Sequence, residues 1–296
     1  MARGRVAVVG SVNMDVVVPV PHLPAPGETV LGGHHRQLPG GKGANQAVGL
    51  ARLDREVALI GCVGRDDFGQ RLRRHLSGEG IDAAGLRETD APTGIAVITV
   101  ADDGENQIAV SPGANSLVGP EDVEAGGVAD ADVVLCQLEV PVGAVEAAAT
   151  LAGGVFVLNP APARALPPGL LQRVDVLVPN RTELGQLGDA NADLDDLDDI
   201  ADVARSLGLP AVAVTLGGQG VLCVTPTAVT HLTPPSIEVV DTTGAGDAFC
   251  AGLVDALIDG ADLVSAAHFG MVVAGKAITR QGAQTALPRR DELACG

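Results

Sequence analysis

Short apolar runs that alternate with longer helix-like segments constrain the fold of this chain more than any other feature. The runs are rich in β-branched residues and occupy residues 5–10, 57–64, 132–139, 154–160, 175–180 and 211–217. Helical periodicity fills intervals at residues 43–53, 69–78, 142–152, 196–207, 245–258 and 262–277. Continuous apolar strands joined by helices typically form a parallel sheet covered on both faces. The sequence therefore predicts a doubly wound, mainly parallel α/β fold, with ligands at the carboxyl ends of its strands.

Two regions interrupt this alternation. Residues 15–38 and 94–110 both have the pattern of hairpins or meanders, and "DDGEN" in the second region is a turn between alternating strands. Extra strands beside a doubly wound sheet predict a small β-sheet lid over the edge where ligands collect. Because no internal repeat or interdomain linker is visible, we expect a single domain over residues 1–296.

The charge balance and the cysteines narrow the class of partner. The 19 basic and 37 acidic residues give a net charge of −18 without any basic cluster, which disfavours nucleic acid and anionic membranes as partners. The apolar runs are too short, or too often broken by proline, for a membrane span or a signal peptide. The cysteines are scattered and odd in number, which favours buried thiols in a reducing compartment. We therefore expect a cytoplasmic protein that binds a small molecule.

The stretch "DTTGAGDAFCAG" at 241–252 places a carboxylate, Asp247, where a glycine turn opens a helix. A helix start offers unpaired N–H groups and a partial positive charge, so it favours an anion. Asp247 is then either that anion or a base beside an anion hole formed by Gly244, Ala245 and Gly246. The second interpretation suits phosphoryl transfer, in which positioning and charge stabilisation do most of the work.

Three other stretches each have a purely structural interpretation beside a functional one. "PGGKGANQA" (39–47) is not a Walker A loop, but its glycines allow a ligand to approach the backbone closely; it could equally be a turn into a helix. Asn180 and Glu183 in "PNRTE" have the spacing of a capping box. "TLGGQG" (215–220) lacks the dinucleotide fingerprint and reads as a tight turn between strands.

Taken in order, eight stretches resemble the signatures of the ribokinase-like (phosphofructokinase B) family of sugar and nucleoside kinases. They are "GSVNMD", "GGKGANQA", "QLE", "LNPAPA", "PNRTE", "TLGGQG", "DTTGAGDAF" and "TRQGAQ". The resemblance extends from about Val6 to Pro288 and implies a Rossmann-like α/β kinase with a β-sheet lid. It implies ATP-dependent phosphorylation of D-ribose at the 5-hydroxyl, with Asp247 as base and the amides of 244–247 as anion hole.

The same resemblance implies two groups of binding residues. Those on the sugar side are Asn13, Met14, Asp15, Gly41, Lys42, Gly43, Ala44, Asn45 and Glu139. Those on the ATP side are Asn180, Thr215, Leu216, Gly217, Gly218, Gln219, Gly220, Gly246 and Met271. Met271 departs from the family, where His or Asn is frequent at this position. A methionine can pack against a base but cannot hydrogen-bond to it as those residues do.

The resemblance also implies two kinds of metal ion and a second subunit. Glu183 should order Mg²⁺ through water. A monovalent cation, K⁺, should bind at Asp241, Thr243, Ala277, Arg280, Gly282 and Ala286. Ala286 stands where the family commonly has serine, so one oxygen ligand is missing or is supplied by backbone. An exposed lid edge favours a homodimer. The alternatives are a kinase for another sugar or a nucleoside, and a sugar-binding regulator without catalytic activity.

Overall fold

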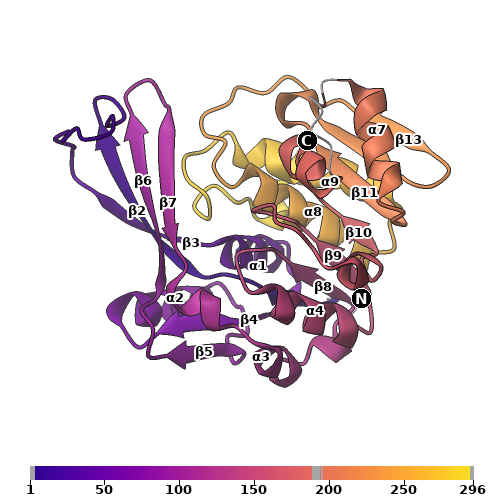
Figure 1. The fold of residues 1–296 in the computed structure, drawn as a ribbon, viewed down its shortest axis with the longest axis horizontal. Coiled ribbons are helices and arrows are strands. Elements are labelled where there is room, and N and C mark those ends of the chain that lie inside the picture. The colour runs from indigo at the N-terminus through magenta and orange to yellow at the C-terminus, as the bar shows by residue number, and fades with distance from the viewer. Residues whose placement is uncertain (1–3, 189–193, 195, 294–296) are drawn as a thin grey trace.

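The structure, a computed structural model, describes residues 4–188, 194 and 196–293, and an α/β body with a separate small sheet is visible in Figure 1. Within these ranges, the body is built on a nine-stranded sheet in the order β13-β12-β11-β10-β9-β8-β1-β4-β5. Its strands are β1 (Arg5–Val9), β4 (Glu56–Gly64), β5 (Leu86–Thr89), β8 (Val133–Cys136), β9 (Val155–Leu158), β10 (Val176–Leu177), β11 (Ala211–Thr215), β12 (Val221–Val224) and β13 (Val229–Leu232). The pairs from β11 to β5 are parallel, whereas β12 and β13 add an antiparallel edge.

Helices cover both faces of this sheet. One hydrophobic cluster joins the sheet to α1 (Lys42–Arg52), α2 (Asp67–Gly78), α8 (Ala245–Ile258) and α9 (Leu263–Ala277). The opposite cluster joins it to α3 (Pro120–Ala125), α4 (Val142–Leu151), α5 (Pro168–Leu171), α6 (Arg181–Leu187) and α7 (Leu197–Ser206). In β1, Val6 and Val8 belong to the first cluster, and Ala7 and Val9 belong to the second, as the alternation of side chains along a strand requires. Both faces are therefore buried, and the predicted doubly wound α/β fold is confirmed.

The four strands of the second sheet come from the two irregular regions of the sequence. They are β2 (Asn13–Val20), β3 (Arg36–Gly40), β6 (Gly94–Ala101) and β7 (Asn106–Ser111), in the order β3-β2-β6-β7. This sheet stands beside the body in Figure 1, on the side of the loops near the carboxyl end of the chain. A pocket of about 570 Å³ separates the two parts, lined by Asp15 and Ile108 of the small sheet and by Asp241 and Gln284 of the body. The small sheet is hereafter called the lid.

The strand order reverses at β1, which places a ligand-binding crevice there. The chain runs outward from β1 to β4 and β5 on one side, whereas β8 to β11 lie on the other. Open α/β sheets bind ligands outside the carboxyl ends of the strands at such a reversal. Ser11 follows β1 and Glu139 follows β8, and the hydroxyl of Ser11 donates to Oε2 of Glu139 at 2.5 Å. The polar ends of the predicted strands therefore meet at this edge of the sheet.

The structure also bears on the cysteines and on the expectation that no segment spans a membrane. The cysteines at 62, 136, 223 and 250 are buried free thiols, and Cys295 lies outside the described residues. Among the helices that the structure describes, we find none long and apolar enough to cross a bilayer.

Candidate active site

Helix α8 opens with the glycine turn that the sequence singled out. Gly244 has a φ of +75°, which favours glycine, and a Cβ there would crowd a facing loop. A Cβ on Gly246 would meet nothing within 4 Å, so this part of the turn faces open space. The N–H of Ala245 is already used, because it donates to the carbonyl of Thr242 at 3.1 Å. The helix start therefore offers an anion-binding position next to Asp247, with Ala245 contributing less than its neighbours.

Two amides of α1 hold the buried carboxylate of Asp247. Nδ2 of Asn45 donates to its Oδ2 at 2.8 Å, and Nε2 of Gln46 donates to its Oδ1 at 2.9 Å. Nε2 of Gln46 also donates to Oδ1 of Asn159 at 3.1 Å. A carboxylate can accept about four hydrogen bonds in all. Asp247 is therefore fixed in direction and can still accept a hydrogen bond from a substrate hydroxyl.

Three carboxylates act on the ammonium of Lys42, and a fourth, Asp15, interacts with two of them. Burial alone would lower the pKa of Lys42, but attraction by Asp247, Glu139 and Glu183 raises it above its ordinary value. Burial, together with repulsion from Glu139 and Asp247, raises the pKa of Asp15 to about 7. The cluster therefore combines one cation held in its charged form with an acid that titrates near neutral pH.

Glu139 is tied to the loop that begins α1. In addition to the Ser11 hydroxyl, its Oε2 accepts the backbone N–H of Lys42 at 3.2 Å. The N–H of Gly43 donates to the Ser11 hydroxyl at 3.4 Å, and a Cβ on Gly43 would lie 2.6 Å from the backbone of Ser11. Only glycine permits this close approach. The "GGKGANQA" stretch is therefore a turn into a helix pressed against the end of β1, as its structural interpretation requires, and its role in ligand binding stays a prediction.

The other residues expected on the sugar side differ in their access to solvent. Asn13 is 3% exposed, and its Oδ1 accepts from Nδ2 of Asn115 at 2.7 Å. Met14 and Ala44 are buried in the hydrophobic core, where they support the site and offer no polar group. Gly41 begins α1 as its N-cap residue.

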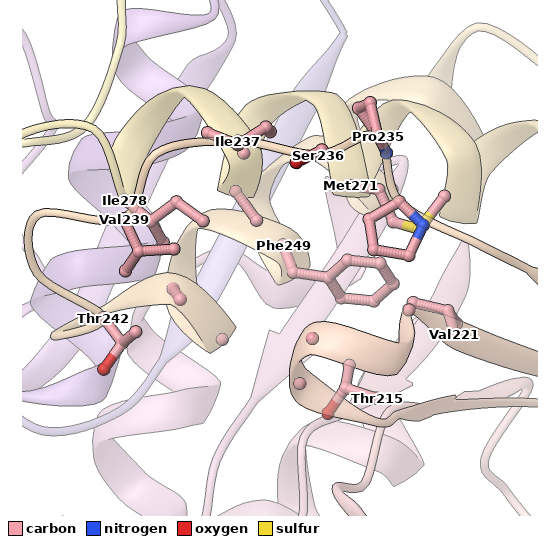
Figure 2. A pocket seen from close by; sticks show the side chains of 18 residues that line it. Thr215, Val221, Pro235, Ser236, Ile237, Val239, Thr242, Phe249, Met271 and Ile278 are labelled. Atoms are coloured by element: carbon pink, nitrogen blue, oxygen red, sulfur yellow. The ribbon is translucent and has the colours of Figure 1, made fainter.

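A second pocket, of about 550 Å³, lies on the other side of the glycine turn (Figure 2). Thr242 marks one end in the picture, beside the start of α8, and Met271 and Val221 mark the other, with the ring of Phe249 between them. From the ATP-side group, the pocket is lined by Thr215, Gly217, Gly218, Gly220, Gly246 and Met271. Leu216 is buried instead, and the side chain of Gln219 bonds with Arg181. The walls of this pocket are mostly apolar, as a site for a flat ring requires.

The "PNRTE" stretch forms the capping box that its spacing predicts. The backbone N–H of Asn180 donates to Oε2 of Glu183 at 2.8 Å, and the N–H of Glu183 donates to Oδ1 of Asn180 at 2.8 Å. Burial raises the pKa of Glu183, and the charge of Lys42 offsets only part of this effect. Glu183 is therefore a half-buried carboxylate whose ionised form a nearby cation would favour.

Asp241 joins the two loops expected to hold a monovalent cation. Its Oδ1 accepts the N–H of Thr243 at 2.9 Å, and its Oδ2 accepts the N–H of Gly282 at 2.8 Å. Although burial alone would raise the pKa of Asp241, these bonds and the Thr243 hydroxyl lower it. The guanidinium of Arg280 pairs with Glu292 and leaves only its backbone for the loop, and the side chain of Ala286 is buried.

Sequence reasoning missed several polar residues of the site. They are Ser11, Gln46, Asn115, Asn159 and Gln284. Four of them lie inside the motifs already quoted, so those motifs marked their neighbourhood. No rule of sequence spacing, however, indicates that these side chains lie near Asp247. Asn115 lies outside every motif, and nothing in its surroundings marks it.

A doubly wound sheet with a lid, and a carboxylate beside an anion-binding turn between two pockets, define a kinase of small molecules. Residues 3–290 match the family model described as pfkB family carbohydrate kinase, and the chain belongs to that family. The resemblance of the motifs is thus confirmed.

Within this family, the relatives and solved structures most similar to the chain include several ribokinases. The chain is 38% identical over 297 residues to a ribokinase of Haemophilus influenzae, a match covering 98% of this chain and 97% of the relative. Its structure is similar to that of a ribokinase from Thermotoga maritima, with a TM-score of 0.90, 34% identity and coverage of 98% and 97%. An Arabidopsis thaliana ribokinase complexed with ribose and ATP matches with a TM-score of 0.88, 31% identity and coverage of 99% and 98%.

Proposed function

We propose that this chain transfers the γ-phosphoryl group of ATP to the 5-hydroxyl of D-ribose. The observation that carries the proposal is the position of Asp247, which lies beside the glycine turn of α8, between the apolar pocket and the acidic cluster. A carboxylate there can accept the proton of the attacking hydroxyl while the turn stabilises the transferring group. Similarity to ribokinases, one of them complexed with ribose and ATP, supports both substrates.

In this proposal the sugar binds between the lid and the start of α1. Asn13, Asp15 and Glu139 supply acceptors for its hydroxyls, and Lys42 supplies a cation. The backbone of Gly41 and Gly43 allows close approach. Asn45 has a smaller part than the motif suggested, because its amide already bonds Asp247 and Gln284.

The nucleotide occupies the apolar pocket, with its base near Met271 and its phosphates near Gly246. The O5–phosphorus bond forms as the bond from phosphorus to the leaving ADP oxygen breaks, and Asp247 receives the hydroxyl proton. Asn180 and Glu183 would hold Mg²⁺ through water; the exposed amide of Asn180 and the half-buried carboxylate of Glu183 suit a hard cation that keeps its own hydration. When bound, Mg²⁺ supplies charge neutralisation at the phosphates.

We propose K⁺ for the loops joined by Asp241. The carboxylate keeps acceptor capacity beyond its bonds to Thr243 and Gly282, and the carbonyls of Ala277, Arg280, Gly282 and Ala286 are the expected additional ligands. The cation would order the start of α8 without contacting substrate.

At the level of the whole chain, we propose one kinase domain over 1–296 with lid segments 15–38 and 94–110. Its place is the cytoplasm, where ATP is available. The lid edge β7 is exposed along its whole length, and Ile108 and Val110 are 56% and 51% exposed, which supports a homodimer formed through the lid.

A coupled ADP-release assay over a panel of sugars and nucleosides tests the proposed function. D-Ribose should give the highest kcat/KM, ahead of adenosine, fructose 6-phosphate and 2-keto-3-deoxygluconate. A higher kcat/KM for adenosine or a sugar phosphate would reject ribose and keep the kinase class, and binding of ribose without turnover would favour the regulator.

A further inference from the structure

A chain of hydrogen bonds leads from Asp247 through two buried amides to the half-buried imidazole of His75. Nε2 of Gln284 donates to Oδ1 of Asn45 at 2.9 Å, and Nε2 of His75 lies 2.7 Å from Oε1 of Gln284. Asn45 then donates to Asp247, so the chain links α2, the loop after α9, α1 and α8. Gln284 is 3% exposed, and its backbone carbonyl is held separately by Arg52 at 2.6 Å.

The hydrogen bonds of this chain all run in one direction. The carboxylate of Asp247 is an acceptor, so the NH₂ group of Asn45 must face it and its carbonyl must face Gln284. Gln284 must then present its own NH₂ group to Asn45 and its carbonyl to His75. The imidazole must carry a hydrogen on Nε2, which both its neutral Nε2–H tautomer and its cation provide. The direction that Asp247 requires of the two amides thus ends in a need for a donor, which Nε2 of His75 supplies.

Asp247 is held by two amides: Asn45, which belongs to the chain described above, and Gln46. The orientation of the Gln46 amide is fixed by other partners. Nε2 of Gln137 donates to Oε1 of Gln46, and Nε2 of Gln46 donates to Asn159 as well as to Asp247. Gln46 therefore keeps its direction without help from His75. The arm through Asn45 has Gln284 as the partner of its carbonyl, so its direction depends on Gln284.

We infer that Gln284 and His75 are positioning residues for the catalytic carboxylate, acting through the amide of Asn45. This inference rests on the proposed function, in which Asp247 accepts the proton of the sugar hydroxyl. If Asn45 turned over, its carbonyl would face Oδ2 of Asp247, and the carboxylate would lose a donor and gain a repulsive neighbour. Misplacing a reacting group slows the chemical step far more than it weakens binding of a distant substrate.

Gln284→Glu tests the direction of the chain with almost no change of shape. A glutamate still accepts from His75 but cannot donate to Asn45, so Asn45 should turn its NH₂ group to the new carboxylate. We expect kcat for D-ribose to fall by about 10-fold or more, and KM for ATP to change by less than about 2-fold. Gln70→Glu is the matched control, because Gln70 is exposed on α2 and the charge change is the same.

A pair of variants at His75 tests the terminal donor independently. His75→Phe removes the donor and should lower kcat, whereas His75→Gln places an amide nitrogen near the position of Nε2 and should restore most of it. This pair decides the matter if Gln284→Glu fails to fold in a thermal unfolding scan.

Three outcomes separate the inference from the proposed function. Wild-type chain that phosphorylates no sugar contradicts the proposed function, and the inference fails with it. Wild-type turnover together with equal kcat for Gln284→Glu and Gln70→Glu overturns the inference alone. Equal kcat for the two His75 variants removes His75 from the chain of positioning residues.

Discussion

Two carboxylates of one cluster differ because their neighbours differ. Asp247 has amide donors on both oxygens, at 2.8 and 2.9 Å, which suits a group that must accept a proton from one direction. Asp15 lies where burial and two other carboxylates oppose its charge, so it titrates near neutral pH. These surroundings suit the proposed role of Asp247 as base and that of Asp15 as a hydrogen-bonding partner of a polar ligand.

Replacing Asp247 by Asn tests the base. The amide is nearly isosteric and keeps the helix start, but it cannot take the hydroxyl proton, so kcat should fall by at least about 100-fold. Ribose binding, measured by calorimetry, should remain within about 3-fold of wild type, because the other hydroxyl partners are untouched. Turnover close to that of the wild type in the purified variant would remove Asp247 from the mechanism.

Asp15 gives the chain a pH dependence of definite sign. Its pKa is about 7 when folded against 3.8 for the ordinary carboxyl, so between these values the folded chain binds more protons than the unfolded chain. The stabilisation is complete below the unfolded value and is lost as the pH rises through 7. Asp15→Asn removes this titration, so the unfolding free energy of the variant minus that of the wild type should rise by at least about 1 kcal/mol between about pH 5 and pH 8. A difference independent of pH in denaturant titrations would show that Asp15 keeps an ordinary pKa.

At the scale of elements, the sequence predicted the regular part of the fold and missed the short pieces. The six apolar runs became β1, β4, β8, β9, β10 and β11, because buried parallel strands need uninterrupted apolar residues. β5, β12, α3 and α5 have only four to six residues each, too few for periodicity to show, and their form depends on what they pack against. β10 has only two residues, because the capping box of α6 begins soon after it.

The two loops joined by Asp241 should make the activity depend on the monovalent cation. Since they adjoin the start of α8, K⁺ there should order the anion-binding turn and raise kcat. Initial rates in K⁺, Na⁺ and a bulky organic cation at equal ionic strength should differ, with K⁺ giving the highest rate. Asp241→Asn should reduce the difference in rate between the cations. Identical rates in the wild type would mean that, with alanine at position 286, these loops no longer form a cation site.

At the scale of the whole molecule, the assembly of the site could not be read from the sequence. Asn45 and Asp247 lie 202 positions apart, and His75 and Gln284 lie 209 apart, yet each pair is hydrogen-bonded. Motif spacing carries no information about such contacts, because they depend on how α1, α2 and α8 pack on one face of the sheet. Family resemblance supplied the expected roles of Asp15 and Asp247, which stay predictions, but the amides that hold Asp247 emerge only from the packed structure.

Self-association through the lid is the prediction that belongs to this scale. Ile108 is 56% exposed on the edge strand β7, so we expect the wild type to sediment as a dimer and Ile108→Glu to shift the equilibrium toward monomer in sedimentation velocity. Gln107→Glu, on the same strand with its side chain on the other face, should leave the dimer intact. A wild-type chain that sediments as a monomer would refute association through the lid.

The apolar wall around Met271 also bears on which nucleoside triphosphates can serve as phosphoryl donor. If the base binds there as proposed, a thioether, a phenyl ring and proline rings would select a flat purine by its shape and would make few hydrogen bonds to its edge atoms. We therefore expect guanosine and inosine triphosphates to replace ATP with kcat/KM within about 10-fold, whereas a site with a polar anchor for the base would discriminate far more strongly. Sugar phosphorylation would then follow the total supply of purine triphosphates in the cell, with adenine dominating by abundance.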